Sequence, residues 1–207
     1  MTRDAAHNRA PVAPRCFGYA PATHEFACLG HDAIYNMNNV GADDQATNLR
    51  IDLVGPVATQ SWSIAAIGNR PTTARATVEA KLAAAGIQPL RSALAVPANE
   101  WVNVGRYQLQ LRVDESIGDA SFENFGELTL RCSPSVDILI DLRHGQMKLG
   151  ETATAFLSPD GAWVAVSIVG EDGGEDTLEY SLDTAVLDLA TSCTTQTAQV
   201  WTTAIDG

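Results

Sequence analysis

Two neighbouring pairs, each a histidine followed by a carboxylate, are the residues of this chain best suited to acid–base or metal chemistry: His24-Glu25 and His31-Asp32. The zinc-protease pattern H-E-x-x-H needs two histidines one helical turn apart. Here the histidines are seven residues apart, in a segment that alternates like a strand hairpin. We therefore expect His24 in a solvated turn and His31-Asp32 just past a strand end. A metal-dependent hydrolase using His31 and Asp32 stays open as an alternative.

A loop rich in carboxylates and glycine could bind Ca²⁺, which prefers oxygen ligands. Its acidic residues are Glu171, Asp172, Glu175 and Asp176, and a loop with Asp43 and Asp44 holds the corresponding place earlier in the chain. The EF-hand order of ligands, with its distal glutamate, is absent from both loops. A solvated connection is the competing interpretation. A calcium-stabilised structural component is the second alternative function. The sequence predicts no cofactor, with calcium as the possible exception.

Motifs that activate a nucleophile or hold a phosphate do not occur in the sequence. G-x-S-x-G, S-x-x-K and a glycine-rich phosphate loop are all missing. The four tryptophans could form a stacking surface for a glycan, but as strand residues they are expected mostly in the core or half-buried; they are Trp62, Trp101, Trp163 and Trp201. These observations favour a non-enzymatic protein.

Charge and hydropathy exclude two classes of partner. The formal net charge is −12, and only Lys81 and Lys148 are lysines. An acidic surface repels phosphate backbones, so the sequence argues against nucleic-acid binding. No apolar run approaches the ~20 residues that a membrane-spanning helix needs, and residues 1–14 do not resemble a signal peptide.

The cysteines indicate the compartment. Cys16 and Cys28 lie symmetrically about Ala22, so in an antiparallel hairpin they face each other, close to disulfide geometry. Cys132 and Cys193 each follow a predicted strand and form the natural second pair. An even number of cysteines with a favoured pairing points to an oxidising compartment, the bacterial periplasm or exterior, with any leader absent from this sequence. Four free thiols in a cytoplasmic protein is the alternative.

A short segment that occurs twice indicates the architecture. Residues 17–28 align without a gap to residues 155–166, and each copy is followed by a polar loop and a closing strand. The pattern predicts a three-stranded β-meander used twice, over 15–55 and 152–190. Residues 1–14 are expected to form a flexible tail before a single β-rich domain over 15–207.

The middle section, 56–151, contains the one predicted helix, near 72–85. Thr72 or Thr73 is its expected N-cap, and Gly86 is placed to end it with Ile87 in a Schellman motif. Alternating short strands are expected through the rest of this section.

The stretch Phe156–Val166, which contains Ser158-Pro159-Asp160-Gly161 and is followed by 185–189, resembles the F-S-P-D-G repeat of TolB-like β-propeller blades. The two meanders around a helical middle also resemble uncharacterised bacterial proteins described as predicted secreted. A closed propeller needs at least four blades, and residues 56–151 show no further copy.

The expected fold is therefore mainly β with one helix, its antiparallel meanders forming a sandwich or a partial-propeller-like domain. The expected function is that of a non-enzymatic, exported binding or interaction protein with an unknown protein or glycan partner.

Overall fold

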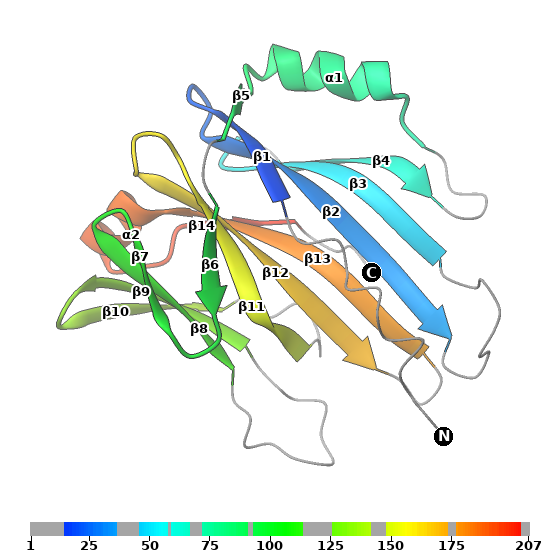
Figure 1. Ribbon diagram of the computed structural model, residues 1–207. Coiled ribbons are helices and arrows are strands. Elements are labelled where there is room, and N and C mark those ends of the chain that lie inside the picture. Colours follow the sequence, from blue (N-terminus) through cyan, green and yellow to red (C-terminus); the bar gives the residue numbers. More distant parts are fainter. Residues whose placement is uncertain are drawn as a thin grey trace, which may run out of the picture.

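The computed structural model describes residues 15–36, 46–57, 59–66, 72–90, 93–113, 126–141, 148–173 and 177–203. The protein is mainly β, with two antiparallel sheets and two short helices, as Figure 1 shows. Neither described helix has the length and apolar character that a membrane span requires. The fold class expected from the sequence is confirmed, and its arrangement is that of stacked β layers.

The larger sheet has ten strands, and seven of them run in the order β4-β3-β2-β13-β12-β11-β6. The remaining three strands pair outside this order: β1 lies between β2 and β5, and β14 pairs with β13. The ten strands are β1 (Arg15–Ala20), β2 (Glu25–Asn36), β3 (Ala46–Val54), β4 (Gln60–Ala66), β5 (Gln88–Pro89), β6 (Leu94–Pro97), β11 (Lys148–Leu157), β12 (Trp163–Gly173), β13 (Thr177–Asp188) and β14 (Val200–Thr202).

The smaller sheet is a four-stranded antiparallel meander in the order β10-β9-β8-β7. Successive residues of a strand point to opposite faces of its sheet. The smaller sheet therefore buries one of its own faces against the larger sheet and leaves the other exposed. In β10, for example, Ile138 and Ile140 are buried while Leu139 is 53% exposed. The strands are β7 (Trp101–Val104), β8 (Tyr107–Val113), β9 (Gly126–Ser133) and β10 (Val136–Asp141).

Strands β2 and β13 join the two halves of the larger sheet along a short seam. They pair only between residues 31–36 and 177–182. Beyond the seam the same edge of β2 pairs with β1, and the same edge of β13 pairs with β14. The two halves therefore diverge from the seam, and Figure 1 shows β2 and β13 close together at one end and apart at the other.

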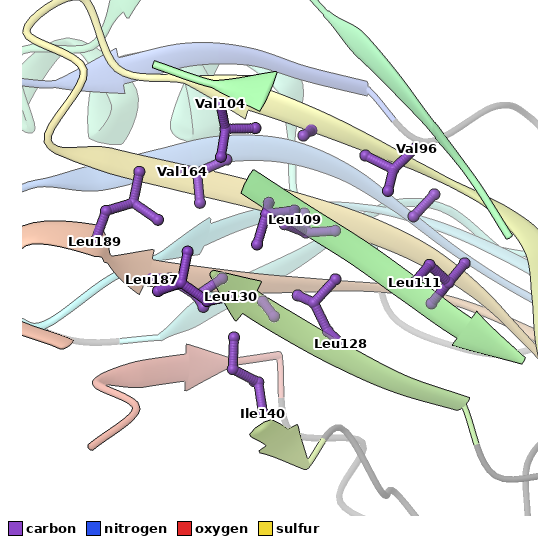
Figure 2. Packing of buried hydrophobic residues seen from close by; sticks show 14 of the residues in the cluster. Val96, Val104, Leu109, Leu111, Leu128, Leu130, Ile140, Val164, Leu187 and Leu189 are labelled. Carbon is purple, nitrogen blue, oxygen red and sulfur yellow. The ribbon is translucent and has the colours of Figure 1, made fainter. Parts of the chain in front are cut away.

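Three hydrophobic clusters lie between successive layers. The first lies between the smaller sheet and β11–β13, where Leu109, Leu111, Leu128 and Leu130 meet Val164 and Leu187 (Figure 2). The second fills the space between the diverging halves and joins Tyr19, Phe26 and the Cys16–Cys28 pair to residues of β11–β13. The third lies beneath the helix α1. The layers therefore have no common core, and a separate hydrophobic cluster holds each layer to the next.

Helix α1 (Arg75–Ala84) covers the third cluster with Val78, its buried residue. Its end follows the Schellman pattern expected from the sequence, because the Ile87 amide donates to the Leu82 carbonyl at 3.2 Å and Gly86 has φ +70°. Its start differs from the expectation: Ala74 is the N-cap and makes no side-chain capping bond. The expected cap at Thr72 or Thr73 is therefore wrong.

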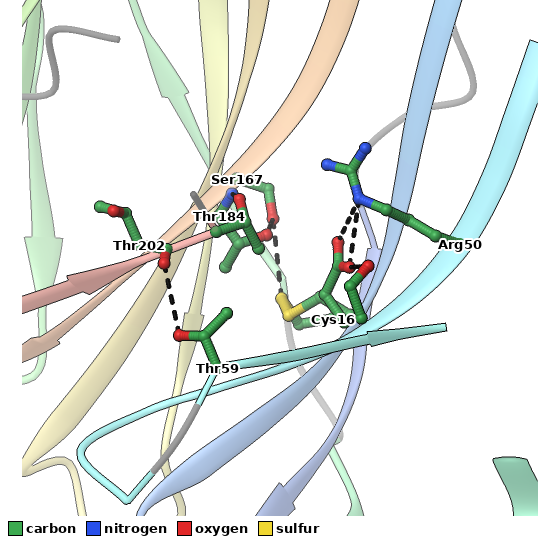
Figure 3. A network of polar contacts seen from close by, with 10 residues as sticks. Cys16, Arg50, Thr59, Ser167, Thr184 and Thr202 are labelled. Atoms are coloured by element: carbon green, nitrogen blue, oxygen red, sulfur yellow. Dashed lines mark hydrogen bonds and ion pairs between the residues drawn. A yellow bond between two sulfur atoms is a disulfide. The ribbon is translucent and has the colours of Figure 1, made fainter. Parts of the chain in front are cut away.

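Buried polar groups between the layers are hydrogen-bonded, as the network in Figure 3 shows. The Arg50 guanidinium contacts the fully buried Asp52 carboxylate at 3.0 Å, and the Ser61 hydroxyl also donates to Asp52. Between the diverging halves, Ser167 lies 3.6 Å from Cys16 Sγ and 3.2 Å from the Thr184 hydroxyl. Because a disulfide sulfur carries no proton, Ser167 donates to it.

Both sequence copies form hairpins, β1–β2 and β11–β12, and these have equivalent registers near their turns. Gly18 pairs with Ala27 in the first, and Phe156 pairs with Ala165 at the aligned positions of the second. A bulge at Phe17 then shifts the first hairpin by one residue and brings Cys16 opposite Cys28. The Cys16–Cys28 disulfide has a Cα–Cα distance of 3.8 Å.

Two elements differ from the sequence expectations. Strand β2 continues to Asn36, so His31 and Asp32 lie inside a strand that pairs on both edges, not past its end. A second helix, α2 (Leu189–Thr195), replaces the end of the expected closing strand and carries Cys193. Asp188 begins this helix, since its carboxylate accepts from the Thr191 amide at 2.8 Å.

Replacing Gly30 of β2 by alanine tests the buried ion pair. A Cβ at Gly30 would collide with the Asp52 carboxylate and lie 2.6 Å from Arg50 Nε. We expect Gly30→Ala to lower the free energy of unfolding by about 2–4 kcal/mol. The control is Gly86→Ala, where φ is +70° and no atom lies within 4 Å, so only backbone strain of about 1 kcal/mol is added. If Gly30→Ala and Gly86→Ala lost the same free energy of unfolding in urea, the close contact of Gly30 with the Arg50–Asp52 pair would be contradicted.

Candidate functional site

Two hairpin turns meet where the halves of the larger sheet diverge, and they bring the only histidine with a described side chain into a cluster. His24 ends the β1–β2 turn with φ +58°. Its Nδ1 atom lies 2.7 Å from the Tyr19 hydroxyl, and its ring stacks on Trp163 at 4.6 Å with 9° between the planes. The expectation of a solvated His24 is therefore wrong, since the imidazole is half-buried and held by two neighbours.

A serine and an aspartate of the second turn complete this cluster. Burial raises the pKa of Tyr19 to about 12, with a further contribution from the charge of Asp160, so the phenol stays neutral. Ser158 donates to Asp160 and accepts from the Trp163 amide at 2.9 Å. The hydrogen bond from Ser158 holds the pKa of Asp160 below its ordinary value.

The residue types Ser158, His24 and Asp160 resemble a catalytic triad, but their contacts do not form one. A triad needs the imidazole bonded to the serine hydroxyl, with the carboxylate on the other ring nitrogen. Here His24 contacts the tyrosine, and the serine proton is given to the carboxylate. Ser158 is also only 2% exposed. The cluster therefore joins two turns and provides no activated nucleophile.

The tryptophans make poor glycan platforms because each ring already has a neighbour over or beside it. Lys81 lies 5.6 Å from the Trp62 ring, Arg131 lies 3.7 Å from the Trp101 ring, and His24 stacks on Trp163. Trp201 contacts Trp163 with ring centroids 5.5 Å apart. As expected from the sequence, Trp62 and Trp163 are buried, and the other two are half-buried.

A pocket of about 360 Å³ lies beside the first hydrophobic cluster, between the smaller sheet and α2. The β7–β8 turn, the β9–β10 turn and α2 supply its walls, and the Cys132–Cys193 disulfide, with a Cα–Cα distance of 5.4 Å, ties β9 to α2. The lining residues are Arg106, Tyr107, Cys132, Ser133, Val136, Ala190, Cys193 and Thr194.

Arg106 is the charged group of this pocket. Its Nη2 atom donates to the Tyr107 hydroxyl at 2.5 Å, and its guanidinium lies 4.9 Å from the Tyr107 ring. Within the described ranges Arg106 has no carboxylate partner, whereas four other arginines have one: Arg50 with Asp52, Arg75 with Glu79, Arg112 with Glu127 and Arg131 with Asp137. No lining residue is acidic.

The side chains proposed as calcium ligands from the sequence lie outside the described part of the structure. Glu171 and Asp172 belong to β12 by their backbone, and their side chains lie outside the described part, as do those of His31 and Asp32. The remaining candidates, Asp43, Asp44, Glu175 and Asp176, lie outside the described residues altogether. Among the side chains that are described, no group of three or more His, Cys, Asp or Glu could hold a metal ion.

Sequence reasoning missed the pocket although two of its signals were present. Gly105-Arg106 separates two short apolar strands, as a hairpin turn does, and the Cys132–Cys193 pair was expected. Helix α2 could not be predicted from the sequence, because its threonines have low helix propensity. Without α2 nothing places Cys193 and Thr194 opposite Arg106.

Replacing Asp160 by asparagine tests the turn cluster. The folded-state pKa of Asp160 lies below its ordinary value of 3.8, so its charge stabilises the fold above about pH 4, and this contribution is lost as the pH falls through the folded-state pKa. Because the carboxylate is exposed and screened by solvent, we expect Asp160→Asn to cost less than about 1 kcal/mol at neutral pH and progressively less below pH 4. Chemical unfolding of both proteins across this pH range measures the difference.

The matched control is Glu79→Gln, which removes an exposed ion pair with Arg75 and should leave stability nearly unchanged. An Asp160→Asn loss that grows as the pH falls would contradict the role given to the carboxylate.

The comparisons with known proteins assign no family to this arrangement. No protein-family profile, no curated protein and no solved structure matches this chain. The functional assignment therefore rests on the contacts of the described residues themselves.

Proposed function

We propose that this protein is a non-enzymatic binding module that works in an oxidising compartment, the periplasm or the cell exterior. The observation that carries the proposal is the state of the cysteines: all four form disulfides, Cys16–Cys28 and Cys132–Cys193, and none is free. Disulfides persist in oxidising compartments and are rare in the cytosol. The second bond also forms part of the pocket wall.

The contacts of the reactive side chains support binding over catalysis. His24 is held between Tyr19 and Trp163, and Ser158 gives its proton to Asp160. A general base needs a free ring nitrogen within reach of a substrate proton, and the Nδ1 atom of His24 is already bonded to Tyr19. The pocket beside Arg106 is the described feature that best suits a ligand, since concave sites with a few polar groups are the usual binding sites.

We further infer that the two meanders are an internal repeat. The hairpins β1–β2 and β11–β12 have the same register around their turns at the aligned positions, with Tyr19 opposite Phe26 and Leu157 opposite Val164. Each hairpin then continues into a third antiparallel strand, β3 or β13. The bulge at Phe17 distinguishes the first copy and accompanies its disulfide.

The oxidation state of the cysteines tests the compartment. We expect protein recovered from the cells that make it, denatured without reductant and treated with a thiol reagent, to show no modified cysteine by intact mass. Four modified cysteines would overturn the exported assignment.

The contribution of each disulfide to the free energy of unfolding is tested by replacing both of its cysteines with serine. Closing loops with sequence separations of 12 and 61 residues should stabilise the fold by about 3 and about 4 kcal/mol. The double variant C132S/C193S is therefore expected to lose more stability in denaturant unfolding than C16S/C28S. Equal stability of all three proteins would show that the bonds do not form.

A further inference from the structure

The pocket beside the Cys132–Cys193 disulfide presents hydrogen-bond donors for which the described residues supply no acceptor. Tyr107 is only 6% exposed, and its hydroxyl accepts from Arg106. The phenolic proton has no acceptor among the described residues, which is costly for a buried polar group. The Ser133 hydroxyl, also in the lining, likewise has no described partner. A guanidinium and two hydroxyl-bearing side chains therefore line the same pocket.

The charge of the lining selects the sign of the ligand. Arg106 brings one positive charge that no described carboxylate neutralises, and the lining contains no acidic side chain. A cation would meet repulsion and find no anionic partner there. An anion would receive charge-assisted hydrogen bonds from the guanidinium, which is planar and matches the two oxygens of a carboxylate.

The net charge of the whole protein limits how much negative charge the ligand can carry. The formal net charge is −12, so the surrounding field opposes anions, and a single arginine offsets one unit. A dianionic phosphate would need more cations than the lining provides. A carboxylate carries one negative charge and fits both the field and the donor set.

The remaining lining residues suit an apolar body behind the charged group. Val136, Ala190 and the disulfide sulfurs offer no strong hydrogen-bond donor. The Thr194 hydroxyl already donates to the Ala190 carbonyl at 2.8 Å, so it has no proton left to give. A volume of about 360 Å³ lies at the small end of ligand sites and suits a short organic acid.

We infer that this pocket binds a carboxylate with a short apolar body, its oxygens at Arg106, Tyr107 and Ser133 and its body against the disulfide. The inference deepens the proposed binding function and rests on it. The carboxylate belongs either to a free small acid or to the C-terminal residue of a peptide, since both present the same group.

The test is a two-dimensional NMR titration of the full oxidised chain with benzoate, phenylacetate and N-acetylphenylalanine, each beside its neutral amide. We expect the acids to shift the amide signals of Arg106, Tyr107, Ser133 and Thr194 at millimolar concentration. Because a hydrogen bond to a charged group is stronger than one to a neutral group, the amides should bind at least about tenfold more weakly. Preference for N-acetylphenylalanine indicates a peptide terminus, and preference for benzoate or phenylacetate indicates a free acid.

Two variants and a matched control locate the contact. Arg106→Gln should abolish binding of the acids, and Tyr107→Phe, which removes only the hydroxyl, should weaken it several-fold. Arg112→Gln is the control, because Arg112 lies on the same hairpin but faces Glu127, and it should bind as the native protein does.

Three results overturn the inference: acids and amides that bind equally, an Arg106→Gln protein that retains full affinity, or no shift at the pocket with any acid. Acids that bind at another surface would refute this pocket while leaving a binding module in place. The proposed compartment fails on a separate measurement, the finding of free thiols.

Discussion

The divergence of β2 and β13 is the constraint on which the rest of the structure depends. The two strands pair over residues 31–36 and 177–182 and then separate, each continuing its ladder with a different neighbour. Separation leaves a space that must be filled, because an empty apolar interior costs dispersion contacts. Tyr19, Phe26 and Trp163 fill it, together with the Cys16–Cys28 bond.

This arrangement explains where the hydrogen bonds, the ring stacking and the Cys16–Cys28 disulfide are found. The seam end is held by backbone pairing, whereas the open end has only side chains between the halves. There the fold places the His24–Tyr19 contact, the Ser158–Asp160 turn and the stacking of His24 on Trp163. Such groups look reactive in sequence, yet their hydrogen bonds lie within the separate turns, and the stacking of His24 on Trp163 holds one turn against the other. The ligand-binding potential lies instead on the far side of β11–β13, where the Cys132–Cys193 bond fixes α2 beside Arg106.

Features encoded by neighbouring residues could be predicted from the sequence, and features that depend on distant contacts could not. The end of α1 followed from Gly86 and Ile87, and β8 is one of the short alternating strands expected in the middle section. The Cys16–Cys28 pair was also predicted, although the symmetry argument did not foresee the bulge at Phe17 that restores it. Local patterns of this kind set the backbone directly. The pairing of β2 with β13 joins segments about 145 residues apart, so no local sequence pattern predicts it. This pairing places His31 and Asp32 inside the sheet. The pocket is of the same kind, since Arg106 and Thr194 meet only once α2 has formed.

The central claim is that a doubly disulfide-linked β scaffold presents one anion-receptive pocket beside Arg106. A crystal structure of the oxidised protein grown with phenylacetate tests it most directly. The account predicts the carboxylate within hydrogen-bond distance of Arg106 and Tyr107, its ring against the Cys132–Cys193 bond, and both disulfides intact. The acid bound instead at the His24–Trp163 cluster, or a pocket closed by the Arg106 side chain, would contradict it.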